Sequence, residues 1–218
     1  MGFDQGGRRM KYTDMTVKEL QNAMAASSPT PGGGTASAIA LGHAASLALM
    51  VSRLTEGKDR WIDGWKIANR VERLAGPLLD QSSDLAQQDS EAFDKVMACF
   101  KLPKSNDEEK ITRKGAIDAA TLFAAEVPYQ TAKSAVDLLE LLPDLARFGN
   151  ANAVTDVGVA GLLASAAAKG ALFNVEINLN SLPLEAGKHI RQELPALKEA
   201  SRLYSRQVMD EVRHRMDS

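Results

Sequence analysis

The chain has 218 residues, enough for one sizeable hydrophobic core and short for two ordinary domains. Its hydrophobic fraction of 44% and charged fraction of 25% are typical of globular proteins. A net charge of -2 excludes the basic surface with which proteins bind nucleic acid or an anionic membrane. We therefore expect a single domain with neither of these partners.

The N-terminal residues are polar and glycine-rich, and no apolar stretch follows their two arginines, which excludes a secretory signal. We expect residues 1–14 to form a disordered tail and residues 15–218 to form one helical domain. Cys99 is the only cysteine, so an internal disulfide is impossible, as suits a protein of the reducing cytoplasm. Its apolar neighbours predict a buried structural thiol.

Apolar residues recur at helical spacing along almost the whole chain, and no long stretch alternates with the period of a strand. The predicted fold is therefore all-α. Thr16 followed by Glu19 is a capping box, which predicts a short helix through Ala26. A second helix is expected over residues 34–55, and its Ala, Ser and Gly content favours a buried helix over a membrane span.

Four prolines lie inside the later predicted helices, which they should kink or interrupt because proline has no amide proton to donate. Ser105 with Glu108 is a second capping box and opens the longest of these helices. The sequence thus predicts an antiparallel bundle of long, proline-kinked helices. The later helices are expected over residues 62–100, 105–149, 153–174 and 185–216, with prolines at Pro77, Pro128, Pro143 and Pro195.

Small residues dominate two of the predicted helices, over residues 36–48 and 157–171. Wide faces of Ala and Gly let helix backbones approach closely and often pack against another chain. A homodimer is the natural expectation from this pattern.

Residues 28–35 read Ser-Pro-Thr-Pro-Gly-Gly-Gly-Thr, the most unusual stretch of the chain. Here two prolines stiffen the approach to three glycines, and a predicted helix follows directly. The free amides of a helix N-terminus favour an anion by ~0.3 to 1 kcal/mol, and glycine lets that anion come close. A tight helix connection explains the pattern equally well, and the Lys-Ser/Thr pair of a nucleotide-triphosphate loop is missing.

Asp89 and Asp156 are isolated carboxylates on predicted helices that are mostly apolar. A carboxylate near a dry helix seam is costly unless it has a partner, which makes each a candidate for moving a proton. The simpler interpretations are a solvated surface position for Asp89 and a helix cap for Asp156.

The three histidines, His43, His189 and His214, are too scattered to predict a metal site, and we expect no metal. His43 lies in the small-residue helix, where a core histidine is favoured over a proton carrier. Basic residues near predicted helix ends are either solvated charges or partners of a carboxylated ligand. These are Lys58, Arg60, Lys104 and Arg113.

Short motifs occur in a fixed order between residues 16 and 216, at residues 28–34, 50–51, 54–58, 89–93, 102–104, 108–110 with Arg113, 127–128, 149–150, Asp156 and 174–179. In this order they resemble the formiminotetrahydrofolate cyclodeaminase and methenyltetrahydrofolate cyclohydrolase family. Some members of that family close formiminotetrahydrofolate to methenyltetrahydrofolate with loss of ammonia. Others interconvert methenyltetrahydrofolate and formyltetrahydrofolate with water.

The resemblance implies an all-helical homodimer with a folate site at the glycine-rich segment and the two aspartate motifs. Asp156 or Asp89 would face the reacting carbon, moving a proton and stabilising positive charge, while the other would grip the pterin amino groups. Substrate-binding residues would be Pro31, Gly32, Gly33 and Gly34 for pterin or carboxylate oxygens, Lys58, Lys104 and Arg113 for the glutamate tail, and also Asn150 and Asn152.

The first expectation is thus a cytoplasmic, stand-alone cyclodeaminase, and the second is the cyclohydrolase, because both share these motifs. A non-catalytic folate-binding bundle is a third. No cofactor beyond the tetrahydrofolate substrate is expected.

Overall fold

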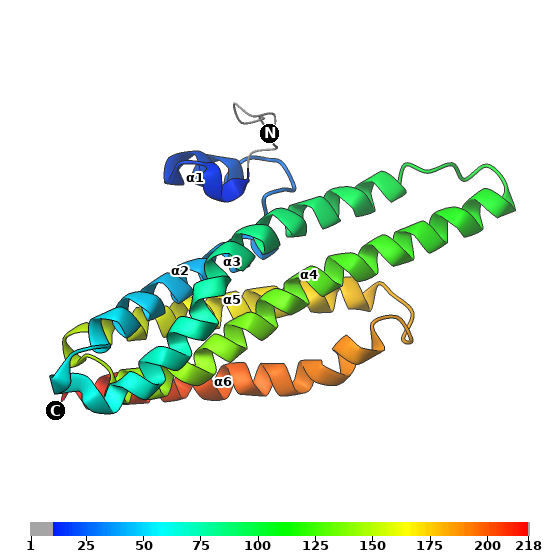
Figure 1. The fold of residues 1–218 in the computed structure, drawn as a ribbon. Coiled ribbons are helices and arrows are strands. Elements are labelled where there is room, and N and C mark those ends of the chain that lie inside the picture. The colour runs from blue at the N-terminus through cyan, green and yellow to red at the C-terminus, as the bar shows by residue number, and fades with distance from the viewer. Residues whose placement is uncertain (1–10, 218) are drawn as a thin grey trace.

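The computed structural model describes residues 11–217, in which every regular element is a helix (Figure 1). The all-α prediction is confirmed. Six α-helices follow one another: α1 (Val17–Met24), α2 (Gly33–Thr55), α3 (Trp65–Cys99), α4 (Asp107–Phe148), α5 (Val154–Asn180) and α6 (Lys188–Met216). Three 3-10 turns accompany them: η1 (Tyr12–Asp14), η2 (Asp59–Gly64) and η3 (Ala151–Ala153).

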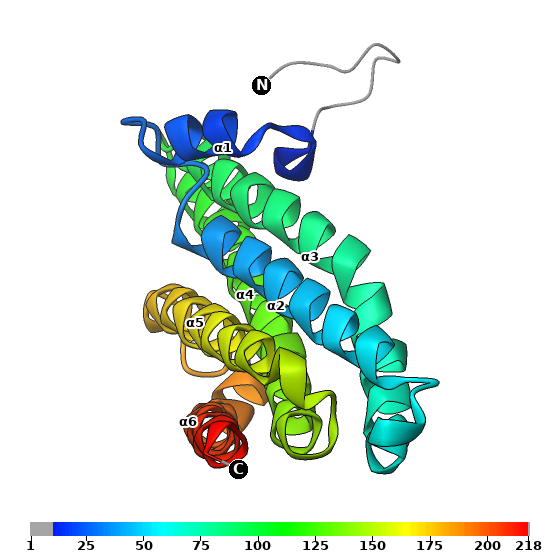
Figure 2. The ribbon, with the colours of Figure 1, turned by 90° about the vertical axis from the view of Figure 1, so that its left-hand side faces the viewer.

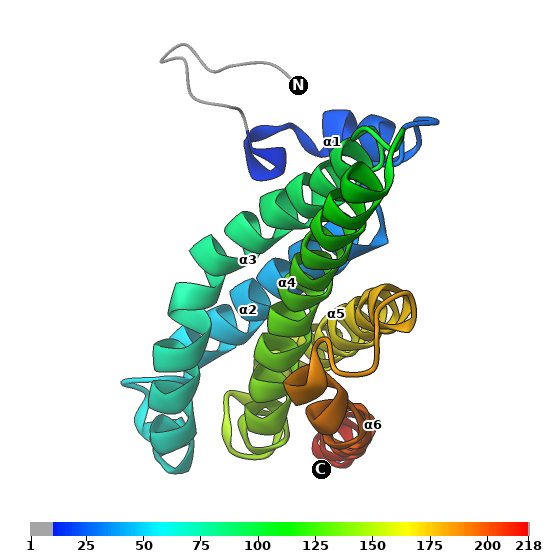
Figure 3. The ribbon, with the colours of Figure 1, turned by 90° about the vertical axis from the view of Figure 1, so that its right-hand side faces the viewer.

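The long helices form one elongated bundle. α2 packs between α3 and α5, and α4 contacts α3, α5 and α6. Figure 1 shows α3 and α4 projecting beyond the other helices as a hairpin. Figure 2 shows α2 and α5 on the same side of the molecule, and Figure 3 shows α4 on the opposite side. α1 lies beside the segment that leads into α2, where Ala23 lines a pocket together with Pro31.

Small residues allow the helices to approach closely. A Cβ on Gly161 of α5 would lie 2.6 Å from Cγ1 of Val208 on α6, a separation that real side chains do not show. The alanines of α2 and α5 are largely buried inside the chain, including Ala44, Ala48 and Ala164. The small-residue faces from which a homodimer was expected therefore pack within one chain, and this reason for a dimer was wrong.

The helices continue through their prolines. α4 is one element of 42 residues although it contains Pro128 and Pro143, and α6 continues through Pro195. The predicted interruptions were wrong, because burial of a long apolar face outweighs one lost backbone hydrogen bond at each proline. The expected kinks stay a prediction.

The helix starts follow local capping chemistry. At α1 the Thr16 hydroxyl accepts from the Glu19 amide at 3.3 Å, which confirms the predicted capping box. At α4 the cap is Asn106, one residue later than predicted, and its side chain accepts from the Glu109 amide at 2.8 Å. An Asn side chain serves at this position as well as Ser does. α5 extends to Asn180, six residues beyond the predicted end.

Part of the predicted tail is ordered. Residues 11–14 hold η1, in which Tyr12 is buried, and the Thr13 and Ser83 hydroxyls are 2.6 Å apart. Lys11 forms an ion pair with Asp84 on α3. These contacts correct the predicted boundary for residues 11–14, and residues 1–10 lie outside the described part of the chain.

Two single-residue predictions also differ from the structure. His43 is exposed rather than in the core, because it lies on the outer face of α2. Cys99 is partly exposed rather than buried, because it ends α3. By length and composition alone α2 and α5 could each cross a membrane, yet about half of each apolar stretch is buried, as in the core helices of soluble proteins.

Candidate functional site

The glycine-rich segment forms the N-terminus of α2, as predicted. Gly32 is the N-cap and provides no side chain for capping, and the preceding Thr30–Pro31 peptide is cis. The first amides of a helix have no partner within it, so the N–H groups of Gly33 and Gly34 are oriented to donate outward. Such a turn suits the oxygen atoms of a ligand.

A cavity of about 320 Å³ lies beside this turn. Its walls come from four helices: the start of α2, Phe93 and Val96 of α3, Ala124 of α4 and the last turns of α5. The volume is at the lower end of the roughly 300 to 1,000 Å³ typical of small-molecule sites.

Asp89 of α3 lines the cavity and lies against the backbone of Gly34. A Cβ on Gly34 would be 2.5 Å from Cγ of Asp89, which real Cβ atoms do not show. Gly34 is therefore required for the carboxylate to reach its position.

Two neighbouring hydroxyl groups, those of Thr35 and Ser90, hold the Asp89 carboxylate in position. Its Oδ2 accepts from the Thr35 hydroxyl at 3.2 Å, and the Thr35 and Ser90 hydroxyls are 3.0 Å apart. If Thr35 donates to Asp89, Ser90 must donate to Thr35, because each hydroxyl has one proton. Burial raises the pKa of the Asp89 carboxyl, and hydrogen bonds from the Thr35 side chain and backbone partly oppose this. The structure thus contradicts the simpler interpretation of Asp89 as a solvated surface residue, because its side chain is half-buried.

Two asparagines on α5 complete the cavity, and neither was predicted as a site residue. The side-chain amide of Asn174 donates to the Gly170 carbonyl at 2.9 Å, and that of Asn178 donates to the Ala124 carbonyl at 2.8 Å. The available signal was their spacing of four residues, which places two polar side chains on one face of an apolar helix.

The other predicted residues near this end of the bundle lie outside the cavity. Pro31 is buried and faces a neighbouring pocket that Tyr12 also lines. Lys104 is exposed in the loop between α3 and α4. Arg113 donates to the Phe100 carbonyl at 3.0 Å, about 16 Å along α4 from Ala124 at roughly 1.5 Å per residue.

The remaining predicted residues lie at the opposite end of the bundle. Lys58 follows α2, whose 23 residues span about 35 Å. Asn150 caps η3, and its amide groups donate to Thr55 and Leu54. Asn152 is exposed beside it. Asp156 is in the first turn of α5, about 27 Å before Asn174, so one chain does not bring it to Asp89.

His43 is also remote from the cavity. It lies about 15 Å along α2 from Gly33. Within residues 11–217 no three His, Cys, Asp or Glu side chains are grouped so as to hold a metal ion. The expected absence of a metal stays a prediction.

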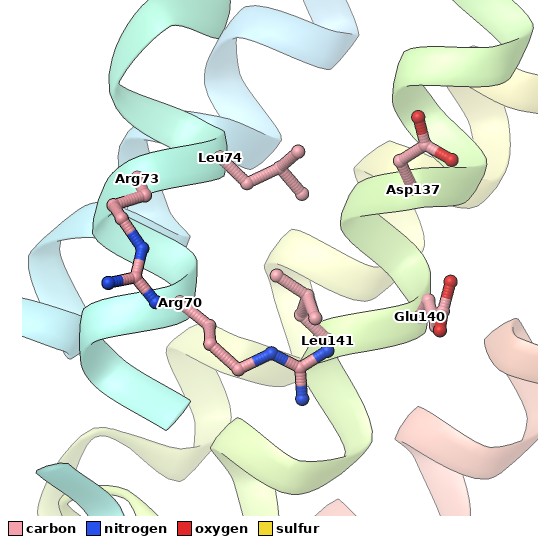
Figure 4. Close-up of a pocket in the computed structure, with 6 residues that line it drawn as sticks. All are labelled: Arg70, Arg73, Leu74, Asp137, Glu140 and Leu141. Carbon is pink, nitrogen blue, oxygen red and sulfur yellow. The ribbon is translucent and has the colours of Figure 1, made fainter. Parts of the chain in front are cut away.

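A second, larger groove of about 420 Å³ lies between α3 and α4 (Figure 4). Arg70 and Arg73 line it from α3, and Asp137 and Glu140 line it from α4. Among the described residues no ion pair joins these two walls. Its charged side chains are exposed, whereas the smaller cavity contains a half-buried carboxylate held by buried hydroxyls. We therefore take the smaller cavity as the candidate site.

The residues that form this site lie within a region that matches a known protein family. A family model described as formiminotransferase-cyclodeaminase matches residues 16–195. The chain belongs to this family. The resemblance found in the motifs is thereby confirmed, and the matched region contains every wall of the cavity.

Relatives in the family carry two related activities in their names. The methenyltetrahydrofolate cyclohydrolase of Methylorubrum extorquens is 35% identical over 77% of this chain and 80% of its own. The formimidoyltransferase-cyclodeaminase of Rattus norvegicus is 30% identical over 81% of this chain, which spans only 32% of that protein. The crystal structure of formiminotetrahydrofolate cyclodeaminase from Thermotoga maritima superposes with a TM-score of 0.82 at 29% identity, covering 93% of this chain and 98% of that one. The family therefore belongs to tetrahydrofolate one-carbon metabolism.

Proposed function

We propose that this chain is a tetrahydrofolate one-carbon enzyme whose active site is the cavity at the N-terminus of α2. The observation that carries the proposal is the Asp89 carboxylate, half-buried at the cavity wall with a raised pKa and fixed by Thr35. The N–H groups of Gly33 and Gly34 supply donors for oxygen atoms of the substrate. The first candidate is the cyclodeaminase, since the Thermotoga maritima structure matches nearly the whole chain.

Asp89 can perform the proton transfer that the cyclodeaminase reaction needs. N10 of formiminotetrahydrofolate attacks the formimino carbon, and the bond from that carbon to the departing nitrogen then breaks. The formimino group reacts as its protonated amidinium form (=NH₂⁺), and after the attack its nitrogen takes up the proton lost by N10. That nitrogen then leaves as ammonia, and the product is the methenyl cation. As a carboxylate Asp89 takes the proton, and as a carboxylic acid it returns the proton to the leaving group. Burial raises the pKa of Asp89, which favours the protonated form that returns the proton, and the ionised form stabilises the cationic amidine centre.

The cyclohydrolase is the second candidate, and the 35% identity to the Methylorubrum extorquens enzyme favours it. There, water attacks the methenyl carbon of methenyltetrahydrofolate. Asp89 would accept a proton from that water and return it to ring nitrogen N5 as the C–N5 bond breaks. The second proton of the water is released to solvent as the formyl C=O forms, leaving 10-formyltetrahydrofolate. The same carboxylate thus serves both reactions.

Methenyltetrahydrofolate absorbance distinguishes the candidates. Purified protein is given formiminotetrahydrofolate in one cuvette and methenyltetrahydrofolate in another, each against a blank without protein. Absorbance gain with ammonia release in the first identifies the cyclodeaminase. Loss faster than the blank in the second alone identifies the cyclohydrolase. If neither cuvette differs from its blank, both enzyme proposals are wrong and binding titrations test the folate-binding bundle.

A homodimer is also part of the proposal, for a different reason from the one first expected. Large apolar side chains are exposed along one side of α5, at Val159, Leu162, Phe173 and Ile177, with spacings that place them on one stripe. Exposed apolar stripes of this kind mark interaction surfaces. Ile177 also lines the cavity, so a second chain on this stripe would lie at its edge. We further propose a cytoplasmic enzyme that needs no cofactor beyond its folate substrate.

A further inference from the structure

We propose that the side-chain oxygens of Asn174 and Asn178 bind the amino edge of the pterin ring. This inference rests on the proposed function and adds the orientation of the substrate in the cavity. From the sequence we expected a second aspartate in this role, but Asp156 lies about 27 Å from Asn174 along α5. The two asparagines stand where that carboxylate was expected.

The hydrogen bonds of the two side chains fix which atom faces the cavity. A backbone carbonyl can only accept, so the group of Asn174 that faces the Gly170 carbonyl must be the NH₂ group. The same argument applies to Asn178, which donates to the Ala124 carbonyl. In each side chain the oxygen is the remaining atom, and no described residue donates a hydrogen bond to it.

The α5 wall therefore presents acceptors. Both asparagines line the cavity, and the carboxylate of Asp89, from α3, adds further acceptor oxygens. A ligand that satisfies the asparagine oxygens must carry several N–H donors along one edge. Tetrahydropterin has such an edge, formed by the 2-amino group and N3–H, and its 4-oxo group and N1 are the acceptors.

The apolar walls fit the faces of the same ring. Phe93 and Val96 line the cavity from α3, and Ile177 lines it from α5. A flat bicyclic ring between these side chains places its donor edge at the asparagines. N5 lies on the other side of the ring from the 2-amino group, which leaves the reacting carbon for Asp89.

Binding of two probes tests the inference. The first probe is 5-formyltetrahydrofolate, and the second is its 2-desamino-2-methyl analogue, which lacks the donors of the 2-amino group. Wild-type protein should bind the first at least about tenfold more tightly, because the analogue leaves desolvated acceptors unpaired. Asn174→Ala should weaken binding of the first probe about tenfold and remove most of the preference. In this variant the Gly170 carbonyl still accepts its backbone hydrogen bond within the helix, so α5 should remain intact.

A control and a second variant complete the design. Asn180→Ala, at the exposed end of α5 and away from the cavity, should bind both probes as wild type does. Asn178→Ser replaces the second amide oxygen with a hydroxyl on a shorter side chain. This variant should also reduce the preference for 5-formyltetrahydrofolate over its analogue. If folded Asn174→Ala keeps wild-type affinity and preference, or if wild-type protein binds both probes equally, the inference is wrong while the folate site stands. If wild-type protein binds neither probe, the proposed function fails together with the inference.

Discussion

The carboxylate of Asp89 lies directly against the backbone of Gly34, in a space that only a residue without a Cβ leaves open. This contact joins two residues that are 55 positions apart in the sequence: a glycine at the start of α2 and an aspartate in the C-terminal third of α3. The contact brings the helix N-terminus and a proton-carrying group to the same cavity.

Gly34→Ala should reduce turnover by about 100-fold, because a displacement of the catalytic group by about 1 Å is enough for such a loss. Helical stability should change little, since Ala is favoured over Gly in a helix by up to ~1 kcal/mol. Kinetic assays and thermal melts measure the two effects. Gly115→Ala on α4 is the matched control, as a Cβ there meets no atom within 4 Å. Wild-type turnover in Gly34→Ala would show that the Asp89 position is unimportant.

Thr35→Val should move the Asp89-dependent limb of the pH–rate profile to higher pH. The lost hydroxyl donates to Asp89 and favours the ionised form, so its removal raises the pKa of Asp89 further. Thr35→Ser keeps the hydroxyl and should restore the wild-type profile. Identical profiles for the two variants would contradict the assigned hydrogen bond.

Asp89→Asn should stabilise the folded protein at pH 8 and leave it nearly unchanged at pH 3. The pKa of Asp89 is higher in the folded state than in the unfolded state. Its contribution to stability is therefore complete below the ordinary aspartate pKa of about 3.9 and is lost as pH rises through the folded value. Urea unfolding of wild type and variant at the two pH values measures this difference. Asp80→Asn, exposed on the same helix, controls for loss of a negative charge. A stability gain that is equal at both pH values would contradict the raised pKa.

Leu162→Asp should convert a dimer into a monomer, because it places a charge in the exposed apolar stripe of α5. Sedimentation analysis gives the mass directly. Leu184→Asp is the control, since Leu184 is 80% exposed and lies beyond the end of α5. A dimer that survives Leu162→Asp would move the interface to another surface.

The fold could be predicted from the sequence to a large extent because helix formation is local. The Thr16 capping box and the start of α2 at the glycines both depend on neighbouring residues only. The continuity of α4 through Pro128 and Pro143 depends on burial against other helices, which no local pattern contains. The same holds for His43, whose exposure depends on which face of α2 packs inward.

The site was predicted only in part, for a similar reason. Gly32 to Gly34 and Asp89 have distinctive neighbours, and the structure brings them together. The bundle is long enough for residues in equally distinctive motifs, such as Asp156 and Asn150, to lie at its far end. Asn174 and Asn178 gain their role from the carbonyls they face, one of which belongs to another helix.

The most direct test of the central claim compares turnover of wild type, Asp89→Asn and Asp156→Asn in the methenyltetrahydrofolate absorbance assay, each variant first shown to be folded. We expect Asp89→Asn to lose at least about 100-fold in turnover, in line with loss of a general acid–base group, whereas Asp156→Asn should stay near wild type. Full activity in folded Asp89→Asn would exclude Asp89 as the proton carrier. A large loss in Asp156→Asn alone would place the reaction elsewhere than at the Asp89 cavity.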